Sequence, residues 1–226
     1  MADCFIKRYK TDTKFITNGI TGIFDTDTLD ISNSLWLNQI KNDNNISLSG
    51  TFSQSQDFGF NALTISGLGY GEYISTIQPS TYYVVARAVT TGYNWSAFIG
   101  KKLKISGYGG KYDYCIYFNT NSSTPQPLCR EDGIETSKVV APCDEYHVIC
   151  RCNGAFIVDG EILSQSRDVS TEYYSGAMEL HRLRRGSWTS GSWTANYLFV
   201  AFGNTDHTIE QALKNSKYLM KKYNIK

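Results

Sequence analysis

Apolar and polar residues alternate along most of the chain with the period of two that is typical of a half-buried β-strand. In the clearest stretch Tyr82, Val84 and Ala86 share one face, and the other face carries Arg87 and is expected to meet water. Similar short runs, bounded by Gly, Asn, Asp or Pro, recur from about residue 34 onward. The pattern predicts one all-β domain of antiparallel strands.

The period changes to 3.6 near the C-terminus. One helical face would carry the apolar residues Ile209, Ala212, Leu213, Leu219, Met220 and Tyr223. Thr208 and Gln211 have the spacing of a capping box, and several lysines follow, where they favour the negative end of the helix dipole. We therefore expect a helix over 208–224 that packs on the sheets.

Composition agrees with a β-sandwich. The 226 residues include 16 Tyr, 11 Phe and 4 Trp, and 19 Gly supply turns. No linker of biased composition divides the chain, so residues 31–226 are expected to form one sandwich with its C-terminal helix. Residues 1–30 have poor periodicity but contain Phe5, Ile6, Phe15 and Ile16. We interpret them as an arm that attaches the domain to a particle or to copies of itself.

The net charge and the N-terminal sequence indicate which classes of partner are not expected. The formal net charge is +1, which provides no long-range field for nucleic acid. The N-terminus lacks the run of about 7 to 15 apolar residues of a signal peptide, and no stretch has the length of a membrane span. These features predict a protein made in a cytoplasm, with no nucleic-acid or membrane partner.

Metal and redox chemistry are not expected. Cys150 and Cys152 would share one face of a strand with Val148, so we expect two reduced, buried thiols. Their spacing does not match that of a zinc site, and nothing in the sequence indicates a metal or another cofactor.

Catalysis is also disfavoured. Glycoside hydrolases need two carboxylates around one bond, whereas acidic residues such as Glu172 and Glu179 stand alone here and are interpreted as surface charges. None of the three histidines has a nucleophile or metal-spaced partner. The glycine-rich stretch Gly67–Gly71 does not open a helix and is interpreted as a turn rather than a phosphate cradle. An enzyme is therefore the lowest-ranked hypothesis.

One stretch resembles a known family. Asp159-Gly160 between apolar flanks predicts a two-residue hairpin. Together with Tyr146-His147-Val148 it resembles the strand-turn-strand signature of concanavalin A-like and laminin G-like domains, found in phage virion and gut-bacterial surface proteins. An early segment from Trp36 to Leu48 and the ending from Tyr197 to Tyr223 resemble the same domains. The resemblance implies a two-sheet antiparallel jelly roll, and commonly adhesion or glycan binding.

Aromatic residues in polar loops are the candidate binding groups. Rings in such loops stack on sugars, although they also pack at sheet edges or in interfaces. The candidates for glycan binding are Tyr93, Trp95, Tyr108, Tyr112, Trp188 and Trp193. Of the two tryptophans in the Gly/Ser-rich stretch near residue 190, Trp188 is expected to be the more exposed.

The sequence supports two non-catalytic hypotheses. The first is a bacteriophage virion subunit, such as a head-fibre, decoration or tail-associated protein, which forms a homo-oligomer, binds other virion proteins and contacts host surface polysaccharide. The second is a lectin-like adhesin module of a gut bacterium, located outside the cell or on its surface. The virion hypothesis explains an extracellular type of fold without a signal peptide.

Overall fold

The computed structural model describes residues 14–41, 43–74, 79–90, 96–103, 114–119, 126–131, 134–136, 144–165, 174–183 and 193–226. In chain order the elements are β1 (Ile20–Asp25), a 3-10 turn (Thr26–Thr28), β2 (Leu29–Asp30), β3 (Leu35–Trp36), β4 (Ile46–Asp57), β5 (Phe60–Ile74), β6 (Thr81–Thr90), β7 (Ser96–Leu103), β8 (Tyr114–Asn119), β9 (Gln126–Glu131), β10 (Ile134–Thr136), β11 (His147–Cys152), β12 (Ala155–Val158), β13 (Glu161–Gln165), β14 (Tyr174–Leu183), β15 (Thr194–Gly203) and α1 (Ile209–Lys222).

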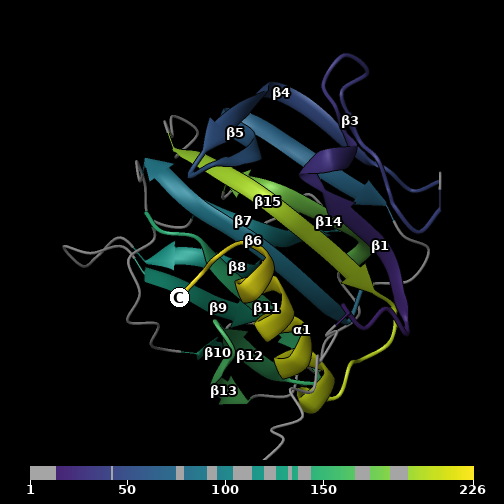
Figure 1. Ribbon diagram of the computed structural model, residues 1–226, viewed down its shortest axis with the longest axis vertical. Helices are drawn as coiled ribbons and strands as arrows, with labels where there is room; N and C mark the ends of the chain where they lie inside the picture. Colours follow the sequence, from purple (N-terminus) through teal and green to yellow (C-terminus); the bar gives the residue numbers. More distant parts are fainter. Residues whose placement is uncertain are drawn as a thin grey trace, which may run out of the picture.

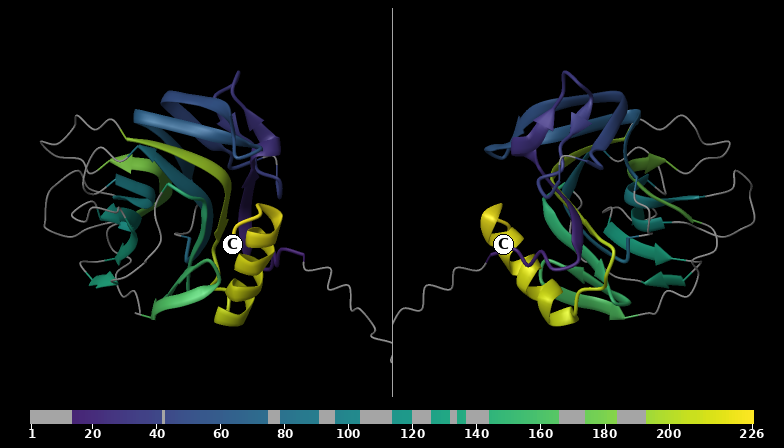
Figure 2. Two further views of the ribbon diagram at one scale, coloured as in Figure 1. Left: turned by 60° about the vertical axis from the view of Figure 1, so that its left-hand side comes forward. Right: turned by 90° about the vertical axis from the view of Figure 1, so that its right-hand side faces the viewer.

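The strands form an antiparallel sandwich of the jelly-roll type, with α1 outside it (Figure 1). One layer has the order β10-β9-β8-β7-β14-β5, and the other has the order β5-β15-β6-β11-β12-β13, with β1 also paired to β15. The helix covers the outer face of the second layer, so the molecule is sheet on sheet on helix (Figure 2). The predicted fold class is confirmed.

Strand β5 belongs to both layers. Residues 63–66 pair with β15, and residues 71–74 pair with β14. The bend between them needs glycine: Gly67 has φ +57°, and a Cβ on Gly69 would lie 2.3 Å from the carbonyl oxygen of Thr51 in β4. The glycine-rich stretch predicted as a turn is therefore a bend inside one strand that carries the chain from one sheet to the other.

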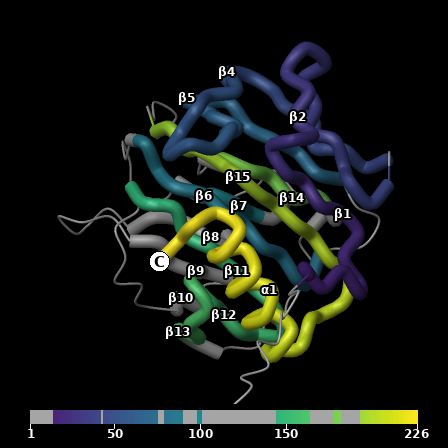
Figure 3. Tube along the Cα trace, in the orientation of Figure 1, coloured from purple at the N-terminus to yellow at the C-terminus, as the bar shows by residue number. Residues whose placement is uncertain are grey.

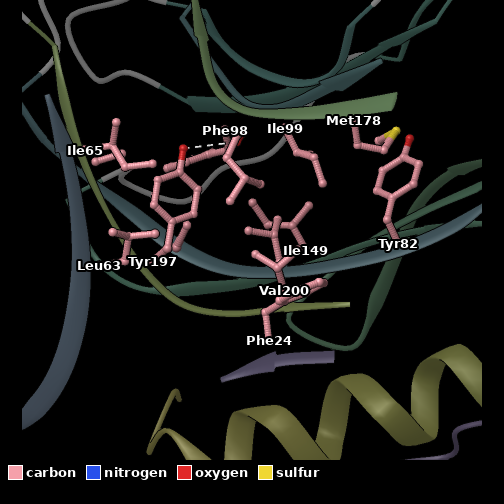
Figure 4. Packing of buried hydrophobic residues seen from close by; sticks show 14 of the residues in the cluster. Phe24, Leu63, Ile65, Tyr82, Phe98, Ile99, Ile149, Met178, Tyr197 and Val200 are labelled. Atoms are coloured by element: carbon pink, nitrogen blue, oxygen red, sulfur yellow. Dashed lines mark hydrogen bonds between the residues drawn. The ribbon is translucent and has the colours of Figure 1, made fainter. Parts of the chain in front are cut away.

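Two apolar clusters hold the layers together. Between the sheets, Tyr82, Val84 and Ala86 pack as the alternation predicted, and Figure 4 shows this cluster with the hydrogen bond from Tyr197 to the carbonyl oxygen of Phe98, 3.0 Å long. The opposite face of β6 was expected to meet water. It is instead buried at Tyr83 and Val85, because the apolar face of α1 covers it.

Helix α1 extends from Ile209 to Lys222, within the range 208–224 that the sequence predicted. Its N-cap Thr208 accepts a hydrogen bond from the backbone of Gln211, whose side chain accepts one from the backbone of Thr208, and this confirms the capping box. Among the described residues, no helix combines the length and the apolar character needed to cross a membrane.

The predicted N-terminal arm is in part a strand of the sandwich. Ile20 to Asp25 pair with β15, as the trace in Figure 3 shows, and the side chain of Phe24 is fully buried. The boundary expected at residue 30 is therefore wrong, since the described part of this segment completes the second sheet.

Phe15 and Ile16, which were expected to attach the arm to a partner, contact their own chain. The ring of Phe15 lies 5.3 Å from that of Tyr83, and the backbone N–H of Ile16 donates to Asn215 of α1 at 2.7 Å. Phe5 and Ile6 lie outside the described residues.

The hairpin that carries the family resemblance has the predicted geometry. Asp159 and Gly160 both have positive φ, +49° and +77°. The carboxylate of Asp159 accepts a hydrogen bond from the backbone of Val148 at 2.8 Å and lies 2.6 Å from the Nδ1 atom of His147. The two segments that resemble the family are therefore in contact with each other, because Asp159 in the turn between β12 and β13 bonds residues of β11.

Candidate functional site

The predicted glycan-binding residues separate into one buried ring and five outside the described residues. Tyr93, Trp95, Tyr108, Tyr112 and Trp188 are not among the described residues. Trp193 is fully buried between the sheets, with its ring 6.0 Å from that of Phe98. A glycan cannot reach this ring, so Trp193 was wrongly assigned to a sugar platform.

Trp193 stacks on a histidine instead. The rings of Trp193 and His181 are parallel, with centroids 3.9 Å apart and an interplanar angle of 2°. Burial in the core lowers the pKa of His181 to about 3, because the charged imidazolium would lose its contact with water. His181 is therefore a neutral core residue at physiological pH.

The cysteine pair is buried as predicted. Val148, Cys150 and Cys152 all pack in the cluster beneath α1, and both thiols are free. Burial raises the pKa of Cys150 above its ordinary value, which makes it a poor nucleophile. Within the part of the chain that the structure describes, no group of three His, Cys, Asp or Glu side chains is placed to hold a metal ion.

Glu179 was interpreted as a surface charge, but the structure buries it. It is only 5% exposed, and in the register of β14 and β5 it lies directly opposite Glu72. Neither carboxylate is free of partners. Glu179 and Glu72 become neighbours because β14 pairs with β5, and their spacing along the sequence does not predict this pairing.

An exposed site lies at the tip of the β4–β5 hairpin. Asp57 and Phe60 are paired, which leaves Phe58 and Gly59 as the two residues of the turn, with φ of +49° and +84°. A type I′ turn needs positive φ at both positions, and Asn, Asp or Gly are the usual residues there. Phe58 adopts this conformation although it is 70% exposed. Strain at a bulky, exposed residue suggests a functional constraint.

The tip is fixed to the second sheet by the carboxylate of Asp57. Oδ2 accepts hydrogen bonds at 2.6 Å from Arg87 Nε, from the hydroxyl of Tyr146 and from the side-chain amide of Asn196. Oδ1 accepts a further bond at 2.6 Å from Arg87 Nη2, and Arg87 Nη1 donates to the carbonyl oxygen of Asp144 at 3.1 Å. These contacts join β4, β6, β15 and the start of β11.

The charges of this site compensate each other. Burial alone would raise the pKa of Asp57, but the hydrogen bonds from Arg87, Tyr146 and Asn196 outweigh burial and lower the pKa to about 2. The hydrogen bond to Asp57 likewise raises the pKa of Arg87. At neutral pH the carboxylate and the guanidinium are both ionised, so the pair carries no net charge.

Phe58 covers this charge pair from outside. The guanidinium carbon of Arg87 lies 5.0 Å from the centre of the Phe58 ring and 5.7 Å from that of Tyr146. The rings of Phe58 and Tyr146 meet edge to face, 6.1 Å apart. One face of an aromatic ring is thus held beside fixed polar groups, and we call Asp57, Phe58, Arg87, Tyr146 and Asn196 the Phe58 site.

Hydroxyl groups extend the site across the sheet. The hydroxyls of Ser55 and Thr64 are 2.7 Å apart, and Thr64 donates to the side-chain oxygen of Asn196 at 2.8 Å. Asn196 in turn bonds Asp57. Two half-buried hydroxyls are therefore connected through the buried Asn196 to the charge pair.

Unused hydrogen-bonding capacity remains at the Phe58 site. A carboxylate accepts about four bonds and a guanidinium donates about five. Asp57 receives four bonds and is saturated, whereas Arg87 uses three of its five donors among the described residues. Two guanidinium donors beside an exposed aromatic ring form a suitable arrangement for a group that carries hydroxyls.

No motif in the sequence singled out these residues. The signal that could have found them is the sequence Asp57-Phe58-Gly59-Phe60, in which glycine makes a two-residue turn possible and a large ring occupies a position that normally holds Asn or Gly. Arg87, Tyr146 and Asn196 come from distant strands, and only the fold brings them together.

Comparisons with known proteins reveal the fold but no family. No family model and no curated protein matches the sequence. A Trypanosoma rangeli sialidase in complex with sialic acid superposes with a TM-score of 0.66 at 13% identity, over 92% of this chain and 34% of the sialidase. The chain therefore spans about a third of the length of that enzyme.

Two further structures have a similar fold: one is a domain of an enzyme, and the other is a toxin. Domain 4 of an extracellular arabinanase from Geobacillus stearothermophilus, in complex with arabinotriose, has a TM-score of 0.59 at 12% identity, over 88% of this chain and 98% of the domain. Botulinum neurotoxin type C, whose cell entry depends on two ganglioside molecules, has a TM-score of 0.56 at 8% identity, over 92% of this chain and 52% of the toxin chain. At these identities the likeness establishes a shared β-sandwich fold.

Proposed function

We propose that this domain is a non-catalytic carbohydrate-binding module and that the Phe58 site holds a sugar. The observation that carries the proposal is Phe58 itself, a ring that is 70% exposed in a left-handed backbone conformation above an ionised, hydrogen-bonded Asp57–Arg87 pair. A sugar would stack its apolar face on the ring, and its hydroxyls would accept hydrogen bonds from the remaining donors of Arg87.

The structural neighbours support this proposal. The matched sialidase and arabinanase domain were each solved with a carbohydrate, and the toxin depends on gangliosides. The arabinanase match is the most relevant in extent, because almost the whole of that separate domain is covered. A module that binds glycan beside a catalytic domain, or without one, is compatible with each of these matches.

The more specific sequence hypotheses stay predictions. Neither the fold nor the neighbours bear on a phage virion role, virion partners, a homo-oligomer or localisation in a virion. The adhesin alternative shares the binding function proposed here. The aromatic candidates outside the described residues also stay predictions, as a second surface that a binding experiment could separate from the Phe58 site.

The test compares Phe58→Ala with Leu68→Ala. Leu68 is a matched control because it is 67% exposed and lies at the bend of β5, remote along the strand from the hairpin tip. Both variants are screened with the wild type against immobilised oligosaccharides that include arabinotriose and ganglioside head groups. We expect Phe58→Ala to weaken binding at least tenfold, as loss of about 1.4 kcal/mol of stacking would, and Leu68→Ala to bind normally.

Two results would overturn the proposal. Equal binding by wild type and Phe58→Ala would show that the sugar does not bind at the Phe58 site. Release of shortened products from a bound glycan, detected by mass spectrometry and abolished in Glu179→Gln, would show that the domain is catalytic.

A further inference from the structure

The helix carries a concentration of positive charge. Residues 209–226 contain five lysines and one glutamate, a net charge of +4, whereas the whole chain has a net charge of +1. The rest of the chain therefore has a net charge of −3. The lysines all lie on the exposed side of α1 or just after it. The surface of α1 is therefore positively charged, although the protein as a whole is nearly neutral.

Most of this charge is not neutralised by the fold. Lys214 pairs with Glu210 at 2.8 Å, and Lys222 pairs with Asp25 of β1. Lys217 and Lys221 have no carboxylate partner among the residues that the structure describes. Lysines in the last turn favour the helix dipole, but Lys214 and Lys217 lie before it, so capping does not explain the row.

Lys214, Lys217 and Lys221 form a ridge, which we call the lysine ridge. Their spacing of three and four residues aligns them along one side of the helix, over a length of about 10 Å. Residues on the opposite side, such as Ala212 and Leu219, are buried against the sheet. The ridge is therefore a straight, solvent-exposed line of ammonium groups.

The hairpin tip that carries Phe58 lies beside the C-terminal end of α1. The ring of Phe60, at the base of the hairpin tip, meets the ring of Tyr223 at 5.6 Å, so the tip abuts the end of α1. In both views of Figure 2 the C-terminal end of α1 points toward the blue strands β4 and β5. The hairpin that carries Phe58 and the C-terminal end of α1 are therefore neighbours in the structure.

We propose that the ligand of this domain is an acidic polysaccharide, with a sugar at the Phe58 site and its anionic groups along the lysine ridge. This inference rests on the proposed function and specifies its substrate class. The Asp57–Arg87 pair is internally neutral, so it selects sugar hydroxyls and leaves carboxylate, phosphate or sulfate groups to the ridge. Lysine acts as a point charge without fixed geometry, which suits repeated charges on a flexible polymer.

The experiment uses the full chain and two double variants. Lys217→Gln with Lys221→Gln removes two charges at little cost in helix propensity, and Lys217→Arg with Lys221→Arg keeps them. Polygalacturonate and alginate serve as acidic probes, dextran and arabinan as neutral probes, and phosphatidylserine vesicles as an anionic surface without sugar polymer. Dissociation constants are measured at two salt concentrations.

We expect the wild type and the Arg variant to bind an acidic probe more tightly than the neutral ones, with affinity that falls as salt rises. The Gln variant should lose about tenfold on the acidic probe and most of the salt dependence. Unchanged binding by the Gln variant would overturn this inference, and so would preferential binding of vesicles. If Phe58→Ala alone leaves every affinity unchanged, the proposed function fails, and that result differs from failure of the ridge.

Discussion

Two aromatic rings in this domain lie against cationic or potentially cationic groups, and they differ in exposure. Trp193 is fully buried and stacks on the neutral imidazole of His181, whereas Phe58 is 70% exposed and covers the charged guanidinium of Arg87. The first ring joins two sheets and the second projects from them. The comparison teaches that a Gly/Ser-rich sequence around a ring does not report its exposure.

The largest expected effect is on the buried ring. Trp193→Ala should lower the free energy of unfolding by about 3 to 5 kcal/mol, because it leaves a cavity beside Phe98 and His181. Denaturant unfolding measures this loss, and Trp193→Phe should lose less. Sugar binding should persist where the variant is folded. A loss below about 1 kcal/mol would contradict the core assignment.

An intermediate effect is expected at the charge pair beneath Phe58. In the folded protein the pKa of Asp57 is about 2, below its ordinary value of 3.8, so the carboxylate stabilises the fold above pH 4 and stops doing so as the pH falls from 3.8 to 2. Asp57→Asn should therefore cost about 2 kcal/mol at pH 7, and the difference from wild type should shrink toward pH 2.

His181 provides the internal control for this measurement. Its lowered pKa makes both proteins less stable as the pH falls from 6.5 toward 3, since the unfolded chain takes up a proton that the folded core excludes. The contribution is common to wild type and variant, so the difference between their unfolding free energies isolates Asp57. A difference that is constant between pH 7 and pH 2 would rule out a stabilising role for the ionised carboxylate.

Local patterns predicted the elements that local forces determine. The capping box at Thr208, the Asp159-Gly160 turn and the inward face of β6 all follow from neighbouring residues, and the structure confirms them. The outward face of β6 was mispredicted because burial of Tyr83 depends on a helix more than 120 residues away, as the hydrogen bond between Tyr83 and His207 illustrates with a separation of 124 residues.

The site could not be predicted in the same way. Asp57 and Asn196 are separated by 139 residues, and their contact depends on the fold of the hairpin over the sheet. The N-terminal strand shows the same limit, because Phe24 has weak local periodicity and is nevertheless buried by pairing with β15. Strand pairing at long range decides which residues become neighbours, and a single sequence contains no direct record of it.

The smallest effect expected is a gain in stability at Phe58. An L-residue other than Gly, Asn or Asp pays about 1 to 2 kcal/mol in the left-handed region, and Phe58 has φ +49°. Phe58→Asn removes most of this strain but also loses the edge contact with Tyr146 and the cover of Arg87. The net result should be a gain of up to about 1 kcal/mol, measured by thermal unfolding.

This variant separates the two roles that a ring above a charge pair can have. If Phe58 serves to shield the Asp57–Arg87 pair, its removal should destabilise the domain, because water would reach a pair that is now only 12% and 14% exposed. If Phe58 serves to bind sugar, the same change should stabilise the domain and weaken binding, as expected where a strained residue is kept for function. Gly59→Ala is the matched control, since it adds strain at φ +84° in open space and leaves the ring in place. A loss of stability in Phe58→Asn together with normal sugar binding would assign the ring to the fold and leave the Phe58 site without its main binding group.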